Sequence, residues 1–157
     1  MSKNTCVLIL ENLRSVENTA SIFRTAEGLG VSKIILVGTT PAPLDRFGRK
    51  RADFAKVSLG SEDLVEWSYE KEITKVIKEL KDQEFKVIAL EQYPESQKLD
   101  PSHKSLVSFA LIVGNEVDGV SGEALKLADK IIEIPMRGKK ESLNVSVSTG
   151  IALFMLI

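Results

Sequence analysis

Short runs of consecutive apolar residues recur along the chain and predict strands that are buried on both faces. They occupy residues 5–10, 33–37, 85–90, 108–113 and 130–134, and polar residues, glycine or proline bound them. Uninterrupted apolar runs of this length are typical of the central strands of a parallel sheet. The pattern therefore predicts a parallel sheet whose two faces are both covered.

Between these runs, apolar residues recur at helical spacing. We expect helices from residue 18 to about 29 and over 70–83, 122–128 and 143–157, with Asn18 or a neighbour and Ser142 as N-caps. Residues 41–60 and 92–105 are predicted as loops. Alternating strands and helices predict an α/β fold, a parallel-sheet α/β/α sandwich of the Rossmann-like or flavodoxin-like kind, with a ligand at the carboxyl ends of the strands.

Composition fits one globular domain. The chain has 157 residues, a net charge of −1 and one cysteine. We expect Cys6 to be a small core residue, no transmembrane span, no signal peptide and a cytoplasmic location. Because the first strand begins within a few residues of Met1, we also expect a single domain over 1–157.

The near-neutral charge means that a polyanionic partner must be held by local patches. Residues 45–53 contain four cations and two carboxylates, and residues 137–140 contain three cations. Each patch alone is more typical of a solvated loop than of a nucleic-acid surface.

Three loops that follow strands contain residues capable of chemistry. The first, residues 12–26, carries Asn18 and Arg24, whose guanidinium could clamp a phosphate or simply be solvated. The second follows the strand at 108–113 and begins with Gly114, which allows close backbone approach to a ligand. The third, residues 134–144, contains Gly138, which permits a tight turn, and ends at a predicted helix start. Taken singly, each loop also fits an ordinary strand-to-helix junction, and neither a dinucleotide fingerprint nor a Walker motif occurs.

Together the three loops closely resemble the motifs of the SpoU or TrmH-like group of SPOUT RNA methyltransferases. The first motif corresponds to Asn12-x-Arg14 with Asn18 and residues 24–26, the second to residues 112–121, and the third, which is the most specific, to residues 134–146. Ala20 and Val117 stand where many members have glycine.

The resemblance implies a deep trefoil knot in the carboxyl-terminal part, one of the rare exceptions to unknotted chain connectivity. It also implies binding of S-adenosylmethionine as methyl donor, a homodimer, and methyl transfer to a ribose 2′-hydroxyl of tRNA or rRNA. By this resemblance we expect residues 1–157 to form a single catalytic domain without the separate RNA-binding domain that many relatives carry. A non-catalytic RNA-binding protein with the same fold and a base-modifying SPOUT methyltransferase are the alternatives. The apolar helix at 143–157, with Leu143, Val147, Ile151 and Phe154 on one face, is expected to pack in a core or a dimer interface.

The resemblance also assigns site residues. Arg24, supplied by the partner subunit, would assist deprotonation of the hydroxyl with an RNA phosphate or stabilise the alkoxide, and no metal is required. The catalytic set is Arg24, Asn18, Asn144, Glu116 and Ser142. The set for the methyl donor is Leu90, Gly114, Asn115, Ile134, Met136, Gly138, Ser142 and Leu143. The RNA-binding set is Arg14, Arg46, Arg49, Lys50, Arg51 and Lys56, with residues 137–140 as an extension.

Overall fold

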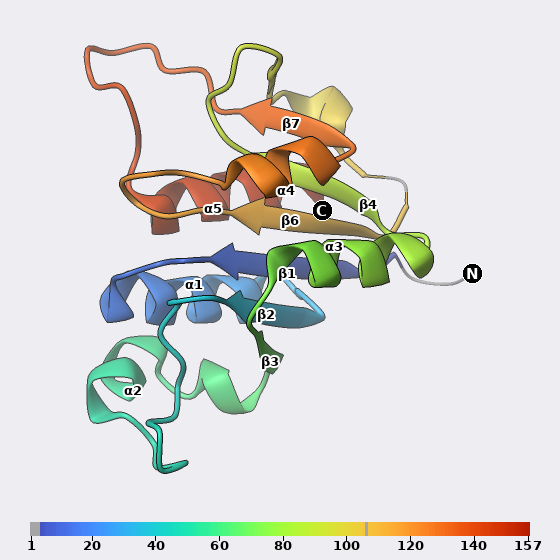
Figure 1. Cartoon of the computed structure of the whole chain (residues 1–157). Coiled ribbons are helices and arrows are strands. Elements are labelled where there is room, and N and C mark those ends of the chain that lie inside the picture. The colour runs from blue at the N-terminus through green and yellow to red at the C-terminus, as the bar shows by residue number, and fades with distance from the viewer. Residues whose placement is uncertain (1–3, 106) are drawn as a thin grey trace.

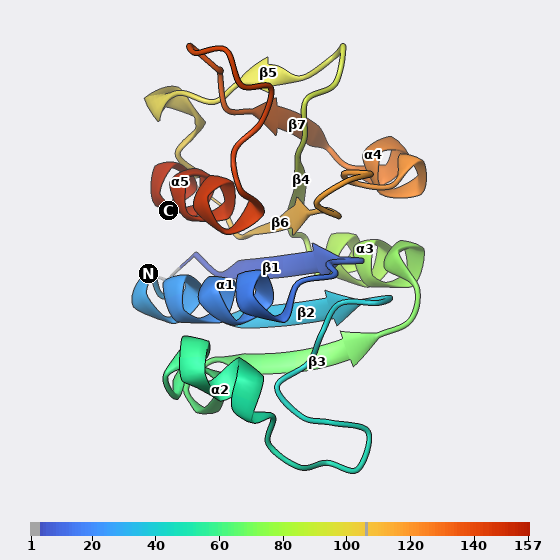
Figure 2. The same ribbon diagram turned by 90° about the vertical axis from the view of Figure 1, so that its left-hand side faces the viewer.

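The strands of the chain form one parallel sheet. The computed structural model describes residues 4–105 and 107–157, and within them seven strands are ordered β3-β2-β1-β6-β4-β7-β5 (Figures 1 and 2). The strands are β1 (Cys6–Glu11), β2 (Lys33–Val37), β3 (Glu66–Glu70), β4 (Lys86–Leu90), β5 (Gln97–Lys98), β6 (Phe109–Val113) and β7 (Lys130–Glu133). All the paired strands run parallel, so their carboxyl ends meet at one edge.

Helices cover both faces of this sheet. They are α1 (Val16–Gly28), α2 (Ala52–Ser58), α3 (Ile73–Asp82), α4 (Gly122–Leu127) and α5 (Val145–Leu156), with short 3₁₀ turns η1 (Ser61–Asp63) and η2 (Pro101–His103). Figure 2 shows α1, α2 and α5 on one side and α3 and α4 on the other. This confirms the predicted parallel-sheet α/β/α sandwich; the trefoil knot stays a prediction.

Two apolar cores result from the alternation of side chains along each strand. In β1, Leu8 and Leu10 face α1, α2 and α5, while Val7 and Ile9 face α3 and α4. Phe23 of α1 and Phe54 of α2 meet edge to face, with ring centroids 5.2 Å apart. Because each central strand is buried on both faces, its residues are apolar without interruption, which is the reason the runs were visible in the sequence.

Elements at the sheet edges were missed. Residues 41–60 are not only loop, because they contain α2, whose buried residues are Phe54 and Ser58 alone. The edge strand β3 has no fully buried residue, so its sequence forms no apolar run. Residues 92–105 also contain the two-residue strand β5 and the turn η2.

The start of the last helix differs from the prediction. Asn144, not Ser142, is the N-cap of α5, because its Oδ1 accepts from the backbone N–H groups of Ser146 at 2.8 Å and Val147 at 3.4 Å. Ser142 lies in the loop two residues earlier. The side chain of Asn144 is therefore held in place at the amino-terminal end of α5.

The last helix is apolar on its exposed side as well as on its buried side. Ala152, Leu153 and Leu156 face the core, whereas Val147 is 50% and Phe154 74% exposed. A helix that is apolar all round is expected to be covered on both sides. The exposed face of α5 is therefore an apolar surface without a partner among the described residues of this chain.

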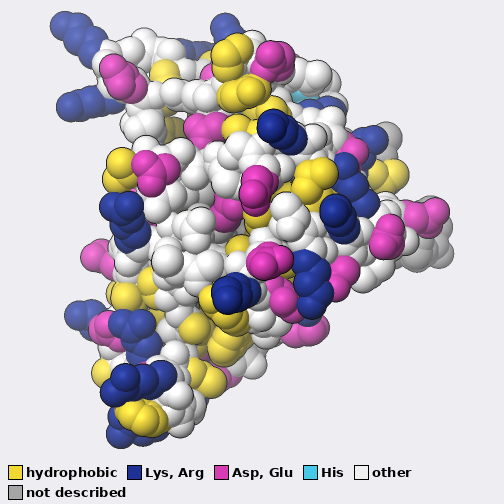
Figure 3. Space-filling view, in the orientation of Figure 1, with side chains coloured by type: hydrophobic (Ala, Val, Ile, Leu, Met, Phe, Trp, Pro, Cys, Tyr) yellow, Lys and Arg dark blue, Asp and Glu magenta, His cyan; other side chains and the backbone are white. Residues whose placement is uncertain are grey.

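Charges are dispersed over the remaining surface. Figure 3 shows Lys and Arg interspersed with Asp and Glu over the face it presents. Cys6 lies in the core as predicted, and burial raises the pKa of its thiol to about 12. No helix among the described residues is long and apolar enough to cross a membrane.

Candidate functional site

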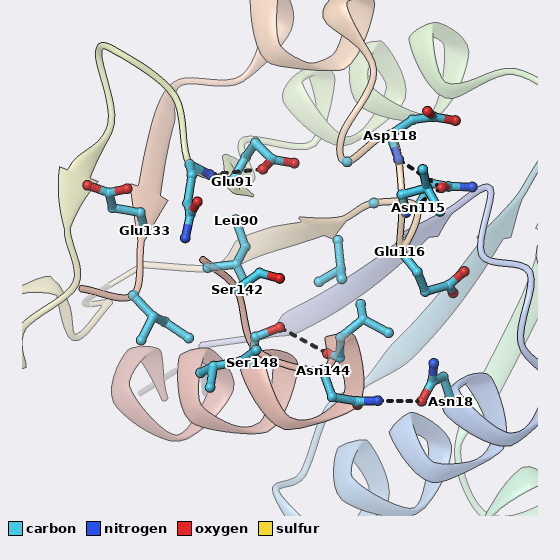
Figure 4. A pocket seen from close by; sticks show the side chains of 18 of the residues that line it. Asn18, Leu90, Glu91, Asn115, Glu116, Asp118, Glu133, Ser142, Asn144 and Ser148 are labelled. Atoms are coloured by element: carbon cyan, nitrogen blue, oxygen red, sulfur yellow. Dashed lines mark hydrogen bonds between the residues drawn. The ribbon is translucent and has the colours of Figure 1, made fainter. Parts of the chain in front are cut away.

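A cavity of about 520 Å³ opens at the carboxyl edge of the sheet. The segments that follow β4, β6 and β7 and the amino-terminal ends of α1 and α5 form its walls (Figure 4). Ten of the residues chosen from the sequence line it, namely Asn18, Leu90, Gly114, Asn115, Glu116, Ile134, Met136, Ser142, Leu143 and Asn144. The structure thus gathers residues from four separate parts of the chain into one site.

Other chosen residues do not line the cavity. Gly138 is exposed in the loop after β7, and Arg24 is exposed on α1. Gly138 lies in a bend, has no left-handed backbone conformation, and a Cβ there would meet nothing within 4 Å, so nothing in the described structure requires glycine at this position. The predicted RNA-binding residues Arg14, Arg46, Arg49, Lys50, Arg51 and Lys56 also lie outside the cavity.

Two asparagines join the first and third motifs. Asn144 Nδ2 donates to Asn18 Oδ1 at 3.2 Å, as Figure 4 shows. Asn144 is held by its role as the cap of α5, and the Asn18 backbone N–H donates to Ser15, the cap of α1. The pair is therefore anchored at two helix starts, with both residues on the cavity wall.

Gly114 is required by contact within the protein, which differs from the reason predicted. A Cβ at this position would lie 2.3 Å from the carbonyl carbon of Gly119 and 2.3 Å from the nitrogen of Val120. Gly119 itself has a φ of 73°, and it exchanges two backbone hydrogen bonds with Asn115. The loop after β6 is thus folded against the end of its own strand, and the contact shapes the cavity wall.

The second motif is tied directly to the first. Asn115 Nδ2 donates to the carbonyl oxygen of Asn12 at 2.7 Å, and both carboxylate oxygens of Glu116 accept from the backbone N–H of Arg14, at 3.1 and 3.2 Å. Asn115 Oδ1 also accepts from two N–H groups of its own loop. These side chains act as structural ties between the loops after β1 and β6.

Sequence reasoning missed several cavity residues at strand ends. Glu91 directly follows β4, and its Oε2 accepts from the Val120 N–H at 2.8 Å while its Oε1 accepts from its neighbour Gln92. Gln92 Nε2 in turn donates to the carbonyl oxygen of Glu141 at 2.6 Å, which joins the loops after β4 and β7. The sequence feature that could have identified Glu91 and Gln92 is that they directly follow the predicted strand at residues 85–90.

The electrostatic character of the cavity follows from its lining. Its carboxylates are Glu91, Glu116, Asp118 and Glu133, and none of the described lining residues is Lys, Arg or His. Leu90, Ile134, Met136 and Leu143 supply apolar side chains. Such a cavity suits a molecule that combines an apolar ring with hydroxyl groups and positive charge. In residues 4–105 and 107–157, no group of three or more His, Cys, Asp or Glu side chains is arranged to hold a metal ion.

These features define an α/β protein with a nucleoside-sized pocket at the carboxyl edge of a parallel sheet. The model of the SpoU rRNA Methylase family matches residues 5–154. The chain therefore belongs to this family, as its motifs predicted.

Individual relatives agree with the assignment. The chain is 32% identical to the 23S rRNA (guanosine-2′-O-)-methyltransferase RlmB of Neisseria meningitidis, over 98% of this chain and 58% of the relative. It is 30% identical to the tRNA (guanosine(18)-2′-O)-methyltransferase of Aquifex aeolicus, over 94% of this chain and 66% of that protein. The chain thus spans little more than half of the first relative's length.

Solved structures share the fold. The TrmH/SpoU tRNA modifying enzyme of A. aeolicus superposes with a TM-score of 0.83 at 28% identity, over 98% of this chain and 74% of that one. The AdoMet-bound rRNA methyltransferase from Sinorhizobium meliloti gives 0.81 at 26% identity, over 98% of this chain and 56% of that one.

Replacement of Gly114 tests whether its close contact with the backbone of Gly119 and Val120 shapes the cavity. Gly114→Ala places a Cβ against backbone that cannot rotate away, so we expect the free energy of unfolding to fall by about 1–3 kcal/mol and the cavity wall to shift. Urea unfolding measures the first effect, and calorimetric titration with S-adenosylhomocysteine the second. Gly138→Ala is the matched control, because a Cβ there meets nothing within 4 Å. Equal stability of the two variants would contradict the packing argument.

Proposed function

We propose that this chain transfers a methyl group from S-adenosylmethionine to a ribose 2′-hydroxyl of tRNA or rRNA in the cytoplasm, and that it forms a single catalytic domain. The observation that carries the proposal is the Asn18–Asn144 pair, which joins two family motifs on the wall of a nucleoside-sized cavity. The activities in the printed names of the relatives support the same reaction.

The cavity fits the methyl donor. Leu90, Ile134 and Leu143 offer apolar surface for an adenine ring. Glu91 and Glu133 are suited to accept from hydroxyl or ammonium groups and to attract a positive charge, since a carboxylate lowers the energy of a nearby cation. The bound donor supplies an activated methyl group, and the chain holds and orients it.

The acceptor needs a different environment. A ribose hydroxyl becomes a strong nucleophile only when its proton leaves, and a nearby positive charge stabilises the resulting alkoxide. We assign stabilisation of the alkoxide to Arg24. Because a guanidinium with a pKa above about 12 is a poor base by itself, an oxygen of an RNA phosphate beside Arg24 accepts the proton from the hydroxyl. Asn18 and Asn144 orient the ribose. Glu116 accepts from the backbone N–H of Arg14 and so holds the loop that leads into α1, the helix of Asn18.

A homodimer completes this site. Arg24 is exposed and lies outside the cavity of its own chain, and the apolar face of α5 is exposed too. Gly150 of α5 packs close to Thr25, the residue next to Arg24, since a Cβ there would lie 3.4 Å from Thr25 Cγ2. Burial of the exposed face of α5 against a second copy would therefore bring the Arg24 region to the interface.

The reaction is tested with a labelled methyl donor. Incubation of unmodified tRNA and rRNA with S-adenosylmethionine labelled in its methyl group should give label in nucleotides that resist alkaline hydrolysis, since a 2′-O-methyl group blocks that cleavage. Arg24→Ala should lower the turnover number by about 10²–10³ with unchanged affinity for the donor, whereas Lys78→Ala, which removes an exposed cation on α3, should have no effect. Label in a base, or no label, would overturn the proposal.

The dimer is tested at the exposed face of α5. We expect the protein to sediment as a dimer at micromolar concentration. Phe154→Arg should give a folded monomer that binds the donor but does not transfer methyl groups, because Phe154 is outside the core and the cavity. Leu64→Arg is the control, since Leu64 is also highly exposed but follows η1 and is not part of α5. A Phe154→Arg variant that stays dimeric would place the interface elsewhere.

A further inference from the structure

The loop between β2 and α2 contains a tightly built turn at residues 45–49. Asp45 Oδ1 accepts from the backbone N–H groups of Phe47 at 2.8 Å and Arg49 at 2.9 Å, and Arg49 Nε donates to Asp45 Oδ2 at 3.0 Å. The Arg49 N–H and then that of Phe47 hold the pKa of Asp45 below its ordinary value. Asp45 also exchanges backbone hydrogen bonds with Gly48 and Arg49, so the turn is ordered without any ligand.

This turn exposes an aromatic ring. Phe47 is 67% exposed, although an apolar side chain of this size is usually buried. The guanidinium carbons of Arg46 and Arg49 lie 4.8 and 5.0 Å from the centre of the ring. In Figure 3, Lys and Arg side chains surround an apolar patch at the lowest part of the molecule, over this loop. The side chain of Phe47 thus has a surface role rather than a core role.

The cations of the same loop are largely engaged. Arg49 pairs with Asp45, Lys50 with Asp63 at 2.9 Å and Arg51 with Asp53 at 2.8 Å. Arg46 makes no ion pair with the described residues. These pairs reduce the attraction of the loop for phosphate, so charge alone gives it little hold on RNA. The feature of the loop that remains free to contact RNA is the ring of Phe47 with the guanidinium groups of Arg46 and Arg49 beside it.

The turn belongs to the edge of the sheet that carries the cavity. Its loop leaves the carboxyl end of β2, where Thr40 accepts from the Leu13 N–H at 3.1 Å and the Thr39 N–H donates to Asn12 Oδ1 at 3.1 Å. The carbonyl oxygen of Asn12 is in turn bound by Asn115 of the cavity wall. The base of the loop is therefore fixed to the site through hydrogen bonds.

We infer that Phe47 is a stacking platform for an unpaired base of the RNA substrate, flanked by Arg46 and Arg49. Aromatic rings and guanidinium planes are the groups on which proteins stack single-stranded bases, and such bases occur in RNA loops and bulges. A turn that is already ordered loses little entropy on binding. The inference rests on the proposed function in that it names the structural feature of the RNA which the enzyme recognises.

The probe is a fluorescent stem-loop RNA with a seven-nucleotide uridine loop, compared with a duplex of the same stem. Fluorescence anisotropy should show that Phe47→Ala weakens binding of the stem-loop by about tenfold, since loss of one aromatic stack typically costs between about 5-fold and 150-fold. Duplex binding and the salt dependence should not change, because no cation is removed. Phe47→Trp should bind as the wild type does, and Phe47→Leu should behave as Phe47→Ala.

Leu64→Ala is the matched control, because it removes an exposed apolar side chain next to Asp63, the partner of Lys50. Equal binding of the stem-loop by wild type and Phe47→Ala, or equal weakening on stem-loop and duplex, would overturn the inference. Methyl transfer to tRNA and rRNA is measured in parallel. If methyl transfer occurs but binding of the stem-loop does not depend on Phe47, the proposed function stands and this inference is wrong. If binding depends on Phe47 but no methyl group is transferred, Phe47 is a platform for an RNA base and the proposed function is wrong.

Discussion

The close approach of the Gly114 backbone to Gly119 and Val120 is the constraint on which the site depends. It folds the loop after β6 back on its strand, and this places Asn115 and Glu116 where they bind the loop after β1. That loop in turn binds the start of the loop after β2. The contact therefore transmits the geometry of one cavity wall across the carboxyl edge of the sheet.

The central part of the fold could be predicted because its physical cause is local in the sequence. Strands such as β1 and β6 are buried on both faces and therefore read as apolar runs. The edge strand β3 and the short helix α2 bury too little to leave such a pattern. At the site, ten residues came from motif resemblance, whereas Glu91 and Gln92 did not, because their role depends on which loops meet in space.

The charges that the proposed reaction needs lie in two separate places on the chain. The cavity has carboxylate and apolar walls suited to a cationic methyl donor, and it contains no Lys, Arg or His among its described residues. In the proposed reaction, positive charge stabilises the activated hydroxyl, and we assign that charge to Arg24, which lies outside the cavity. The exposed apolar face of α5 offers a way to bring that charge in, because a symmetric pair of copies can place each Arg24 beside the other cavity. Catalysis and dimerisation would then depend on the same surface.

The most direct test of this division is complementation between two inactive variants. Arg24→Ala keeps the cavity, and Leu143→Arg blocks the cavity but keeps Arg24. Both are coexpressed with different tags, and the heterodimer is purified. If Arg24 acts on the cavity of its partner, the heterodimer has one complete site of two and recovers about half of the wild-type methyl transfer. A heterodimer as inactive as either parent would contradict the account.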